Sequence, residues 1–400
     1  MGALPVRTLP LLLALAVLAA SCSVLGGDAE ADDVDADAAE VDEADGSQDQ
    51  DEPEDDGEVE QGDEDEEEEE EAGADEPPPE PVDVAPLTGE PVADDVDLDR
   101  PVAAVKLDNH PNAQPPVGLD DADIVLTAVI EGGQTRLVAF YHGAAPERVG
   151  PVRSAREADA DLLPAFDPVV GISGGERSVL NALHQAGITA YAEGTVEGFE
   201  RDPNRPAPHD LFVSVPALWA AAEELPSAER PWEIDDRDIP DADPADPPEG
   251  GDEIDGVEIA FSDSMRAVWD WVDDRDGGHW ERTQEWVEWE RRDEEPADAR
   301  NVVIARVPVT PGTRTDASGA QTQELGVLGE GEALVLRDGR AYEARWQKPG
   351  PGDHFSFTTP DGDPLPLAAG RTWVELVPLG GIAELQGGDA VEDDEDDLGT

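Results

Sequence analysis

The sequence predicts a protein of the α+β or α/β class. We expect a mixed α/β N-terminal domain, then a smaller and mostly β C-terminal domain, both behind a disordered acidic spacer. Strands alternate with amphipathic helices over residues 98–228, which is typical of α/β domains. Alternating strands and hairpin turns fill residues 255–380. Between residues 28 and 80 about half of the side chains are acidic, and such a segment buries too little apolar surface to fold.

The amino terminus predicts export and a lipid anchor. Arg7 precedes an apolar run over residues 9–20, which is short for a membrane span and typical of a signal peptide, here residues 1–21. The sequence AASC is similar to a bacterial lipobox and ends at Cys22, the only cysteine of the chain. A diacylglyceryl group there supplies the two acyl chains that stable anchoring needs. We expect the protein at the extracytoplasmic face of the cell membrane; the alternative is an ordinary secretory signal.

Residues 22–97 predict an extended spacer between that anchor and the folded part. No Lys or Arg occurs between Arg7 and Arg100, and like charges along a chain repel one another. The chain carries a formal net charge of −73, and residues 381–400 predict a second acidic segment, a disordered tail. Binding to nucleic acid requires clustered cations, so this composition excludes nucleic acid as a partner.

Short patterns predict the elements of the first domain. Residues 101–109 are rich in β-formers, and two apolar strands flank a hairpin turn at 131–133. A helix is expected from Ser154, because Glu157 three residues later completes a capping-box pattern. Residues 168–175 predict a buried strand that ends in glycines. An amphipathic helix, a short strand, and a last strand and helix complete the domain.

Residues 229–254 are rich in Pro and Asp and predict a linker. In the second domain, hairpin turns are expected at 276–278 and at 338–339. Five tryptophans gather in this domain: Trp269, Trp271, Trp280, Trp286 and Trp289. Their expected role is core packing, and the alternative is an exposed aromatic strip that contacts a glycan or a protein partner.

Two arginines follow the turn at Gly150-Pro151, which is unexpected in so acidic a chain. A helix N-terminus offers free backbone N–H groups, and a guanidinium offers planar donors suited to carboxylate or phosphate. The pattern predicts an anion pocket formed by Arg153, Ser154 and Arg156. Alternatively, both arginines pair with the acidic residues that follow on the same predicted helix, Glu157, Asp159 and Asp161.

Further polar residues are candidates for ligand contact: Lys106, Asp108, Asn109, Glu131, Arg136, Arg205 and His209. The first three end the first strand, where ligands bind in open α/β sheets, although Asp and Asn also stabilise turns. The next two flank the tip of a hairpin, and the alternative is an ion pair between them across the turn. The last two lie on a loop that prolines stiffen.

The candidates for catalysis are Ser173 and His209. The stretch GISGG at 171–175 has the G-x-S-x-G spacing, and with His184 or His209 as base it is compatible with a serine hydrolase. No metal or cofactor is expected, because the chain has no cysteine pair and no H-x-x-x-H pattern. The Asp-rich turns at 274–277 and 361–363 lack the downstream acid of a calcium loop.

Several ungapped motifs occur in a fixed order: AVKLDNHP, GLDDADIV, EGGQTR, PERVGPVRSAR, RPAPHDLF and TWVELVP. They closely resemble those of the YerB-like lipoproteins, the DUF3048 family of uncharacterised function, over about residues 98–380. The resemblance implies a bacterial envelope lipoprotein with an N-terminal and a separate C-terminal domain. It marks as the family's polar positions Lys106, Asp108, Asn109, Glu131, Thr135, Arg136, Arg153, Ser154, Arg156, Arg205 and His209. Thr127 and Asp210 depart from the pattern, which usually has an acid and an Asn there.

These observations predict a membrane-anchored extracytoplasmic lipoprotein that binds an anionic ligand or a cell-envelope component. An Arg-containing cleft of the N-terminal domain is the expected site. Two alternatives remain open. One is a hydrolase or transferase that acts on cell-wall or surface polymers. The other is a structural partner of another envelope protein, which the tryptophan-rich domain would contact.

Overall fold

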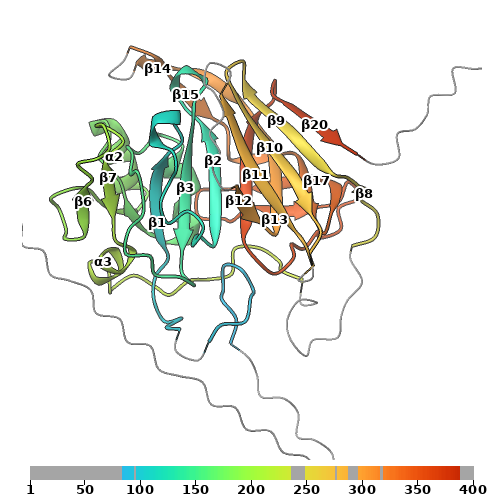
Figure 1. The fold of residues 1–400 in the computed structure, drawn as a ribbon, viewed down its shortest axis with the longest axis horizontal. Helices are drawn as coiled ribbons and strands as arrows, with labels where there is room; N and C mark the ends of the chain where they lie inside the picture. The colour runs from blue at the N-terminus through green and yellow to red at the C-terminus, as the bar shows by residue number, and fades with distance from the viewer. Residues whose placement is uncertain are drawn as a thin grey trace, which may run out of the picture. The chain divides into compact units, whose positions relative to one another are not determined.

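A computed structural model describes residues 83–93, 96–235, 248–274, 277–286, 296–315 and 319–387, all within the unit Asp75–Thr400 (Figure 1). Several predictions fall outside these residues. They are the signal peptide, Cys22, most of the spacer and the tail beyond residue 387, together with Trp289 and the side chain of Trp286.

The largest element is an 11-stranded mixed sheet (Figure 1). Ten of its strands have the spatial order β18 (Ser356–Thr358), β17 (Arg340–Lys348), β16 (Gly329–Arg337), β13 (Asn301–Val307), β19 (Thr372–Pro378), β2 (Ile124–Val129), β3 (Thr135–Tyr141), β1 (Ala103–Asp108), β4 (Val169–Gly171) and β5 (Thr189–Tyr191). The eleventh, β8 (Asp252–Glu253), pairs with β17. Parallel pairs are β13–β19, β19–β2, β1–β4 and β4–β5.

Strand β19 joins the two halves of the chain. It lies between β13 and β2 and runs parallel to both, so that Trp373 is opposite Val302 on one side and Val125 on the other. Because β2 belongs to the first predicted domain and β13 and β19 to the second, one sheet runs through both segments. The apolar pattern of TWVELVP predicts a buried strand but does not specify its neighbours.

Strands predominate over helices, so the α/β prediction holds only in part. The described α-helices are α1 (Asp159–Leu162), α2 (Arg177–Gln185) and α3 (Val215–Ala220), and 3₁₀ turns occur at Pro111–Ala113, Glu131–Gly133 and Pro164–Phe166. Helix α2 connects the parallel strands β4 and β5, which is the arrangement expected of an α/β unit. No helix among the described residues is long and apolar enough to cross a membrane.

The helix predicted to begin at Ser154 is wrong, because the structure keeps this segment extended and α1 begins at Asp159. The backbone N–H of Arg153 donates to the Lys106 carbonyl at 2.8 Å, and that of Ala155 donates to the Gly174 carbonyl at 3.0 Å. These hydrogen bonds hold residues 153–155 across the ends of β1 and β4. A capping-box pattern reports only local preference, whereas these acceptors are distant in the sequence.

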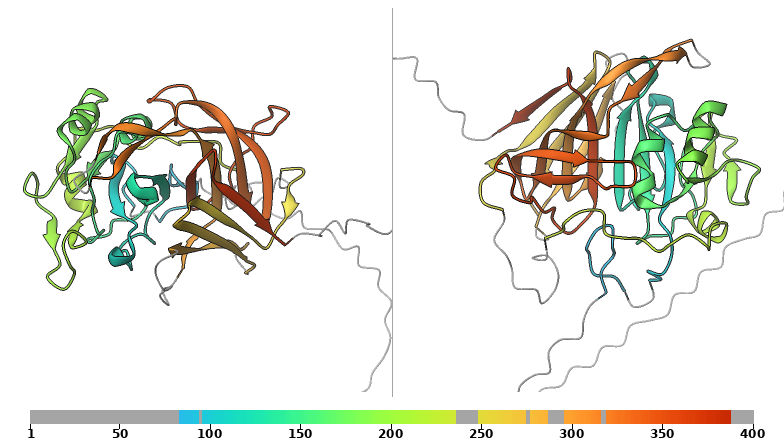
Figure 2. Two further views of the ribbon diagram at one scale, coloured as in Figure 1. Left: turned by 90° about the horizontal axis from the view of Figure 1, so that it is seen from above. Right: turned by 180° about the vertical axis from the view of Figure 1, so that it is seen from behind.

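A five-stranded antiparallel sheet packs against one face of the main sheet (Figure 2). Its strands are, in order, β12 (Ala297–Ala299), β11 (His279–Trp286), β10 (Met265–Val272), β9 (Gly256–Ser262) and β20 (Ile382–Gln386). Trp269 and Trp280 are fully buried between the sheets, and the Trp269 ring packs against Trp373 of β19 with centroids 5.4 Å apart. Core packing is therefore confirmed for these two tryptophans, and neither forms part of an exposed strip.

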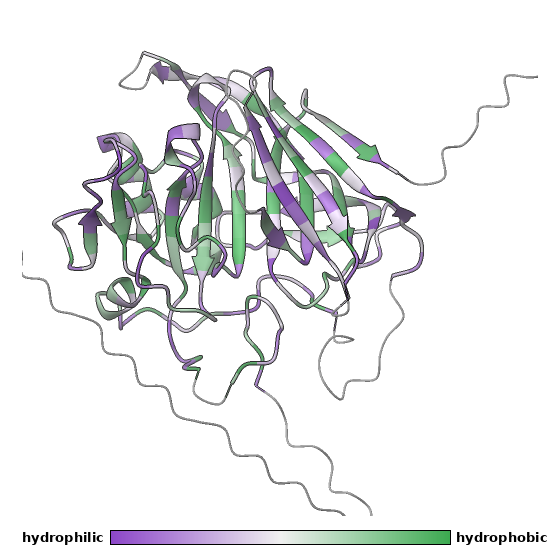
Figure 3. Cartoon of the chain, viewed as in Figure 1, coloured by the Kyte–Doolittle hydropathy of each residue, from purple (hydrophilic) through white to green (hydrophobic). Residues whose placement is uncertain are grey.

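The opposite face of the main sheet packs against α1 and α2. Ala104 of β1 contributes to this core with Leu162 of α1 and Val179 of α2. Lys106 follows Ala104 by two residues and so points to the same face, where its Nζ lies 2.6 Å from Asp159 Oδ1. Figure 3 shows hydrophobic residues along the main-sheet strands, with hydrophilic positions on β1 and on the hairpin formed by β14 (Val309–Thr315) and β15 (Gln321–Leu325).

Packing extends beyond each predicted domain boundary. Leu87 of the predicted spacer is fully buried, and Trp232 and Ile234 of the predicted linker are nearly buried. Strand β20 falls inside the predicted tail, where it pairs with β9. The boundaries differ from the predicted ones because composition describes only the average of a segment. A few apolar side chains are enough to hold such a segment against the core.

Candidate functional site

A cavity of about 400 Å³ opens at the end of β2, beside the extended segment 153–156. Four arginines line it, namely Arg136 of β3, Arg153 and Arg156 of the extended segment, and Arg314 of β14. We call this cavity the arginine pocket. Ser154, Glu131, Glu157 and Glu176 also line it, together with Gly175 and Val179 at the start of α2 and Thr322 and Gln323 of β15.

The turn before these arginines has a fixed position. Val152 bridges to Leu107 of β1, and the Val149 N–H donates to the carbonyl of Val213 at 2.8 Å, in β7 (Leu211–Val213). β7 pairs with β6 (Phe199–Arg201). A Cβ at Gly150 would lie 2.7 Å from the Leu211 carbonyl oxygen, so only glycine allows this close approach. The turn is thereby clamped between two strands, which sets the direction of the arginine segment.

Arg136 is a buried cation without a carboxylate partner. Its side chain lines the pocket although the residue is only 5% exposed. Nη1 donates to the Ser154 carbonyl at 3.0 Å, whereas Nε is buried without a hydrogen-bond partner. Among the described residues no carboxylate lies within ion-pair distance of it. Burial, with repulsion from Arg156 and Arg153, lowers the pKa of Arg136 to about 9.

The other three arginines of the pocket are each paired with an acid. Arg156 Nε lies 2.8 Å from Glu131 Oε1, and Arg153 Nε lies 3.2 Å from Asp108 Oδ2. The Arg153 contact has the distance of an ion pair but not the geometry of a hydrogen bond. Arg314 pairs with Glu157 and Glu176. Arg136 is therefore the one arginine of the pocket with which no described carboxylate forms a direct ion pair.

These pairs exclude two particular ion pairs that the sequence left open. Glu131 does not pair with Arg136 across the hairpin turn, because Arg156 takes its carboxylate. Arg156 does not form an ion pair with the acids of its own segment; only its backbone N–H donates to Asp159, at 2.7 Å. Both alternatives assumed pairing between neighbours in sequence, whereas the fold brings closer partners from other strands.

Asp108 and His209 form a separate pair beside the pocket. His209 Nδ1 lies 2.7 Å from Asp108 Oδ2, and the His209 ring stacks on His110 with centroids 5.0 Å apart. Burial alone would raise the pKa of Asp108, but the hydrogen bond with His209 and the charge of Arg153 lower it below its usual value. Asp108 thus connects the histidine to Arg153 and so to the pocket wall.

The serine candidate for catalysis has no base beside it among the described residues. Ser173 Oγ lies 3.2 Å from Ser154 Oγ, and the described contacts of His209 include neither serine. His184 is exposed on α2. The G-x-S-x-G spacing therefore does not bring Ser173 into a described hydrogen bond with a histidine.

Several predicted ligand residues bind groups of the protein itself and lie outside the lining of the arginine pocket. Lys106 is buried against Asp159, and Asn109 Nδ2 donates to Thr135 Oγ1 at 2.8 Å. Arg205 donates to the carbonyls of Ala113 and Pro115, at 2.8 and 2.7 Å. Of the predicted set, the structure gathers in the pocket Glu131, Arg136, Arg153, Ser154 and Arg156.

Sequence patterns do not predict the wall that the second segment contributes to the pocket. Arg314, Thr322 and Gln323 come from the β14–β15 hairpin, about 180 residues after Arg136. No motif marks Arg314, which is a single arginine in a polar strand. The pocket is consequently composite, because residues of both halves of the chain line it.

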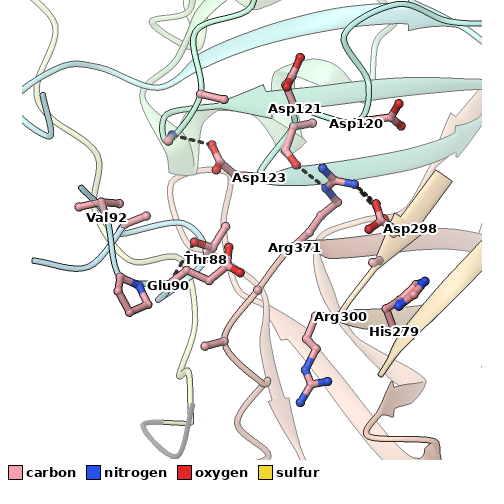
Figure 4. A pocket seen from close by; sticks show the side chains of 18 of the residues that line it. Thr88, Glu90, Val92, Asp120, Asp121, Asp123, His279, Asp298, Arg300 and Arg371 are labelled. Carbon is pink, nitrogen blue, oxygen red and sulfur yellow. Dashed lines mark hydrogen bonds and ion pairs between the residues drawn. The ribbon is translucent and has the colours of Figure 1, made fainter. Parts of the chain in front are cut away.

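A second and larger cavity, of about 930 Å³, lies at the opposite end of β2 (Figure 4). Acidic and basic side chains mix in its wall, and Arg371 pairs with Asp298. Asp123 is nearly buried there and accepts hydrogen bonds from the backbone N–H groups of His142 and Gly143. Burial raises the pKa of Asp123 to about 6 despite these bonds. Among the described residues no group of side chains forms a metal site.

Two models of one protein family match this chain, one in each half. Residues 87–228 match the "Protein of unknown function (DUF3048) N-terminal domain", and residues 257–374 match its C-terminal domain. These matches cover more than half of the chain, which therefore belongs to the DUF3048 family, as the motifs predict.

One relative is "Putative lipoprotein YerB" of Bacillus subtilis (strain 168). It is 28% identical over 319 residues, which cover 77% of this chain and 90% of that protein. The crystal structure of YerB from Bacillus subtilis is similar with a TM-score of 0.60 and 24% identity, covering 75% of this chain and 99% of that one. The structural likeness shows that the two proteins share a fold.

The two departures from the family pattern lie outside the arginine pocket. Thr127 is fully buried and its Oγ1 accepts a hydrogen bond from Trp373 Nε1 at 2.8 Å. Asp210 pairs with Arg201 at 2.7 Å. Both side chains bind groups of the protein, so neither alters the lining of this pocket.

Proposed function

We propose that this protein is a membrane-anchored extracytoplasmic lipoprotein that binds an anionic ligand or a cell-envelope component in the arginine pocket. The observation that carries the binding proposal is Arg136. A buried charge is costly to keep unless an opposite charge and hydrogen bonds compensate it. An anion in the pocket would supply the direct ion pair that no described carboxylate forms with Arg136.

The surroundings of Arg136 favour a binding role over a structural one. A cation kept only for stability would be expected to pair with a carboxylate, and Glu131 lies close enough to stabilise the charge of Arg136 without a direct ion pair. Instead Glu131 binds Arg156, and Arg153 and Arg156 add positive charge beside Arg136. The volume of about 400 Å³ lies within the range of small-molecule sites. Guanidinium groups are the side chains best suited to oxyanions.

The anchor rests on the sequence AASC at Cys22 and on the name of the YerB relative. Two acyl chains hold a protein stably at a bilayer, whereas one chain does not. We expect the mature protein, isolated from the membranes of its own cells, to begin at Cys22 and to carry a diacylglyceryl group. Intact-mass measurement checks this, and an unmodified Cys22 would contradict the anchor.

The binding proposal is tested by R136Q. We expect the full chain to bind either inorganic phosphate or succinate in isothermal titration calorimetry, at about 0.15 M NaCl. R136Q should weaken that binding at least tenfold, about 1.4 kcal/mol, because it removes the buried charge that has no direct ion-pair partner. Glutamine retains a donor for the Ser154 carbonyl, and loss of the buried cation relieves repulsion, so circular dichroism should show a folded variant.

The matched control is R345Q, at an exposed position of β17, which lies towards the end of the main sheet opposite to β1, β4 and β5. It removes one positive charge from the same acidic chain without touching the pocket. Equal loss of binding in R345Q and R136Q, or no binding of either anion by the unmodified chain, would contradict the proposal.

A further inference from the structure

The arginine pocket has a second set of donors, at the N-terminus of α2. This helix has nine residues, and its N-cap Glu176 forms no side-chain cap. The backbone N–H groups of Arg177, Ser178 and Val179 donate to no described residue. Free N–H groups and the positive end of the helix dipole favour an anion at this place.

Of these three residues Val179 lines the arginine pocket, as Arg136 does. Gly175, Glu176 and Val179 line it on the α2 side, and Arg136 lines it from β3. Arg136 is the independent observation, because its side chain is 95% buried while its Nε and Nη2 have no acceptor among the described residues. Two separate elements thus present unsatisfied donors to the same space.

We propose that the arginine pocket binds a phosphoryl group, held between the first turn of α2 and Arg136. This inference rests on the proposed anion-binding function and names the chemistry of the ligand. A phosphoryl group has oxygens in several directions, so donors that arrive from two walls can each bind one. A carboxylate has two oxygens in one plane, and a single guanidinium satisfies both.

The acidic side chains of the pocket each lie in an ion pair. Glu131 is neutralised by Arg156, and Glu157 and Glu176 share Arg314. Arg314 also donates to Ser178 Oγ, so the β14 strand lies beside the first turn of α2. The second half of the chain thereby supplies the wall that faces the proposed phosphoryl position.

The test uses titration calorimetry on the full chain with four probes: inorganic phosphate, glycerol 3-phosphate, glycerophosphoglycerol and succinate. At least one phosphoryl probe should bind at least tenfold more tightly than succinate. S178D should weaken that binding at least tenfold, because its carboxylate competes for the free N–H groups and repels the anion. An acidic residue in the first turn stabilises a helix, so S178D is expected to fold. S178A is the matched control and should change affinity less than threefold.

The probes also separate the sources of the phosphoryl group. Tightest binding of inorganic phosphate would support a free ion as the ligand. Tightest binding of glycerol 3-phosphate, a monoester, would support a small metabolite. Tightest binding of glycerophosphoglycerol, a diester, would support a lipid headgroup or a polymer unit. Succinate binding that equals phosphoryl binding and is lost in R136Q would overturn this inference and leave the anion-binding function intact. Phosphoryl binding that S178D does not weaken would overturn it as well. Absence of binding for all four probes would overturn both.

Discussion

R282M is expected to lower the free energy of unfolding by about 3–5 kcal/mol, because it would leave a buried carboxylate without its cation. Arg282 Nε lies 2.8 Å from Glu375 Oε1 in the core between the two sheets, and both side chains are nearly or fully buried. Trp269 Nε1 donates to the same oxygen at 3.1 Å. One neutral hydrogen bond does not compensate a buried charge, so the loss should approach the full cost of desolvation.

Urea denaturation of the full chain, followed by tryptophan fluorescence, measures this loss. R266M is the matched control, because Arg266 pairs with Glu258 in the same small sheet but is half exposed. An exposed pair of this kind contributes about 0–1 kcal/mol. The double variant R282M/E375M should recover most of the stability, since it removes both charges. A loss in R282M no larger than that in R266M would show that the buried pair does not hold the sheets together.

The second large effect is a pH dependence that D123N should remove. The folded-state pKa of Asp123, about 6, lies above the unfolded value near 3.9, so the folded protein holds this proton more tightly. The contribution of Asp123 to stability is therefore complete below pH 4 and is lost as the pH rises through 6. Two pKa units correspond to about 3 kcal/mol, which the ionised side chain costs at pH 7.

The measured quantity is the difference in unfolding free energy between D123N and the unmodified chain. It should rise by about 2–3 kcal/mol in favour of D123N between pH 4 and pH 7. Asparagine retains an oxygen that can accept from the backbone N–H groups of His142 and Gly143. D361N, on an exposed turn, controls for the loss of one formal charge. A difference that stays constant with pH would contradict this prediction.

The local sequence patterns located many strands correctly but could not assign their neighbours. The hairpin at 131–133 joins β2 to β3 as expected, and the turn at Asp338-Gly339 joins β16 to β17. Hairpins are predictable because the turn and both strands are adjacent in sequence. The pairing of β19 with β2 is not, because about 240 residues separate them and many apolar strands have the same pattern.

The same limit applies to the site. Motifs marked five residues that line the arginine pocket, but the sequence did not reveal which charges would pair. Glu131 pairs with Arg156 and not with Arg136, although Arg136 is nearer in the sequence. Asp108, Asn109 and His209 have the polar character of ligand residues, yet the fold gives each a partner within the protein. Pairing depends on distances of a few ångström, which only the packed structure fixes.

The sequence by itself determined the family, the acidic character of the chain, the apolar strands and the positions of the arginines. These properties are local, because they depend on residue types and on short spacings. Only the tertiary structure decided that one sheet runs through both halves, that the segment at Ser154 is extended, and that Arg136 is left without a carboxylate. Those outcomes arise from long-range contacts, where burial makes the position of each charge decisive.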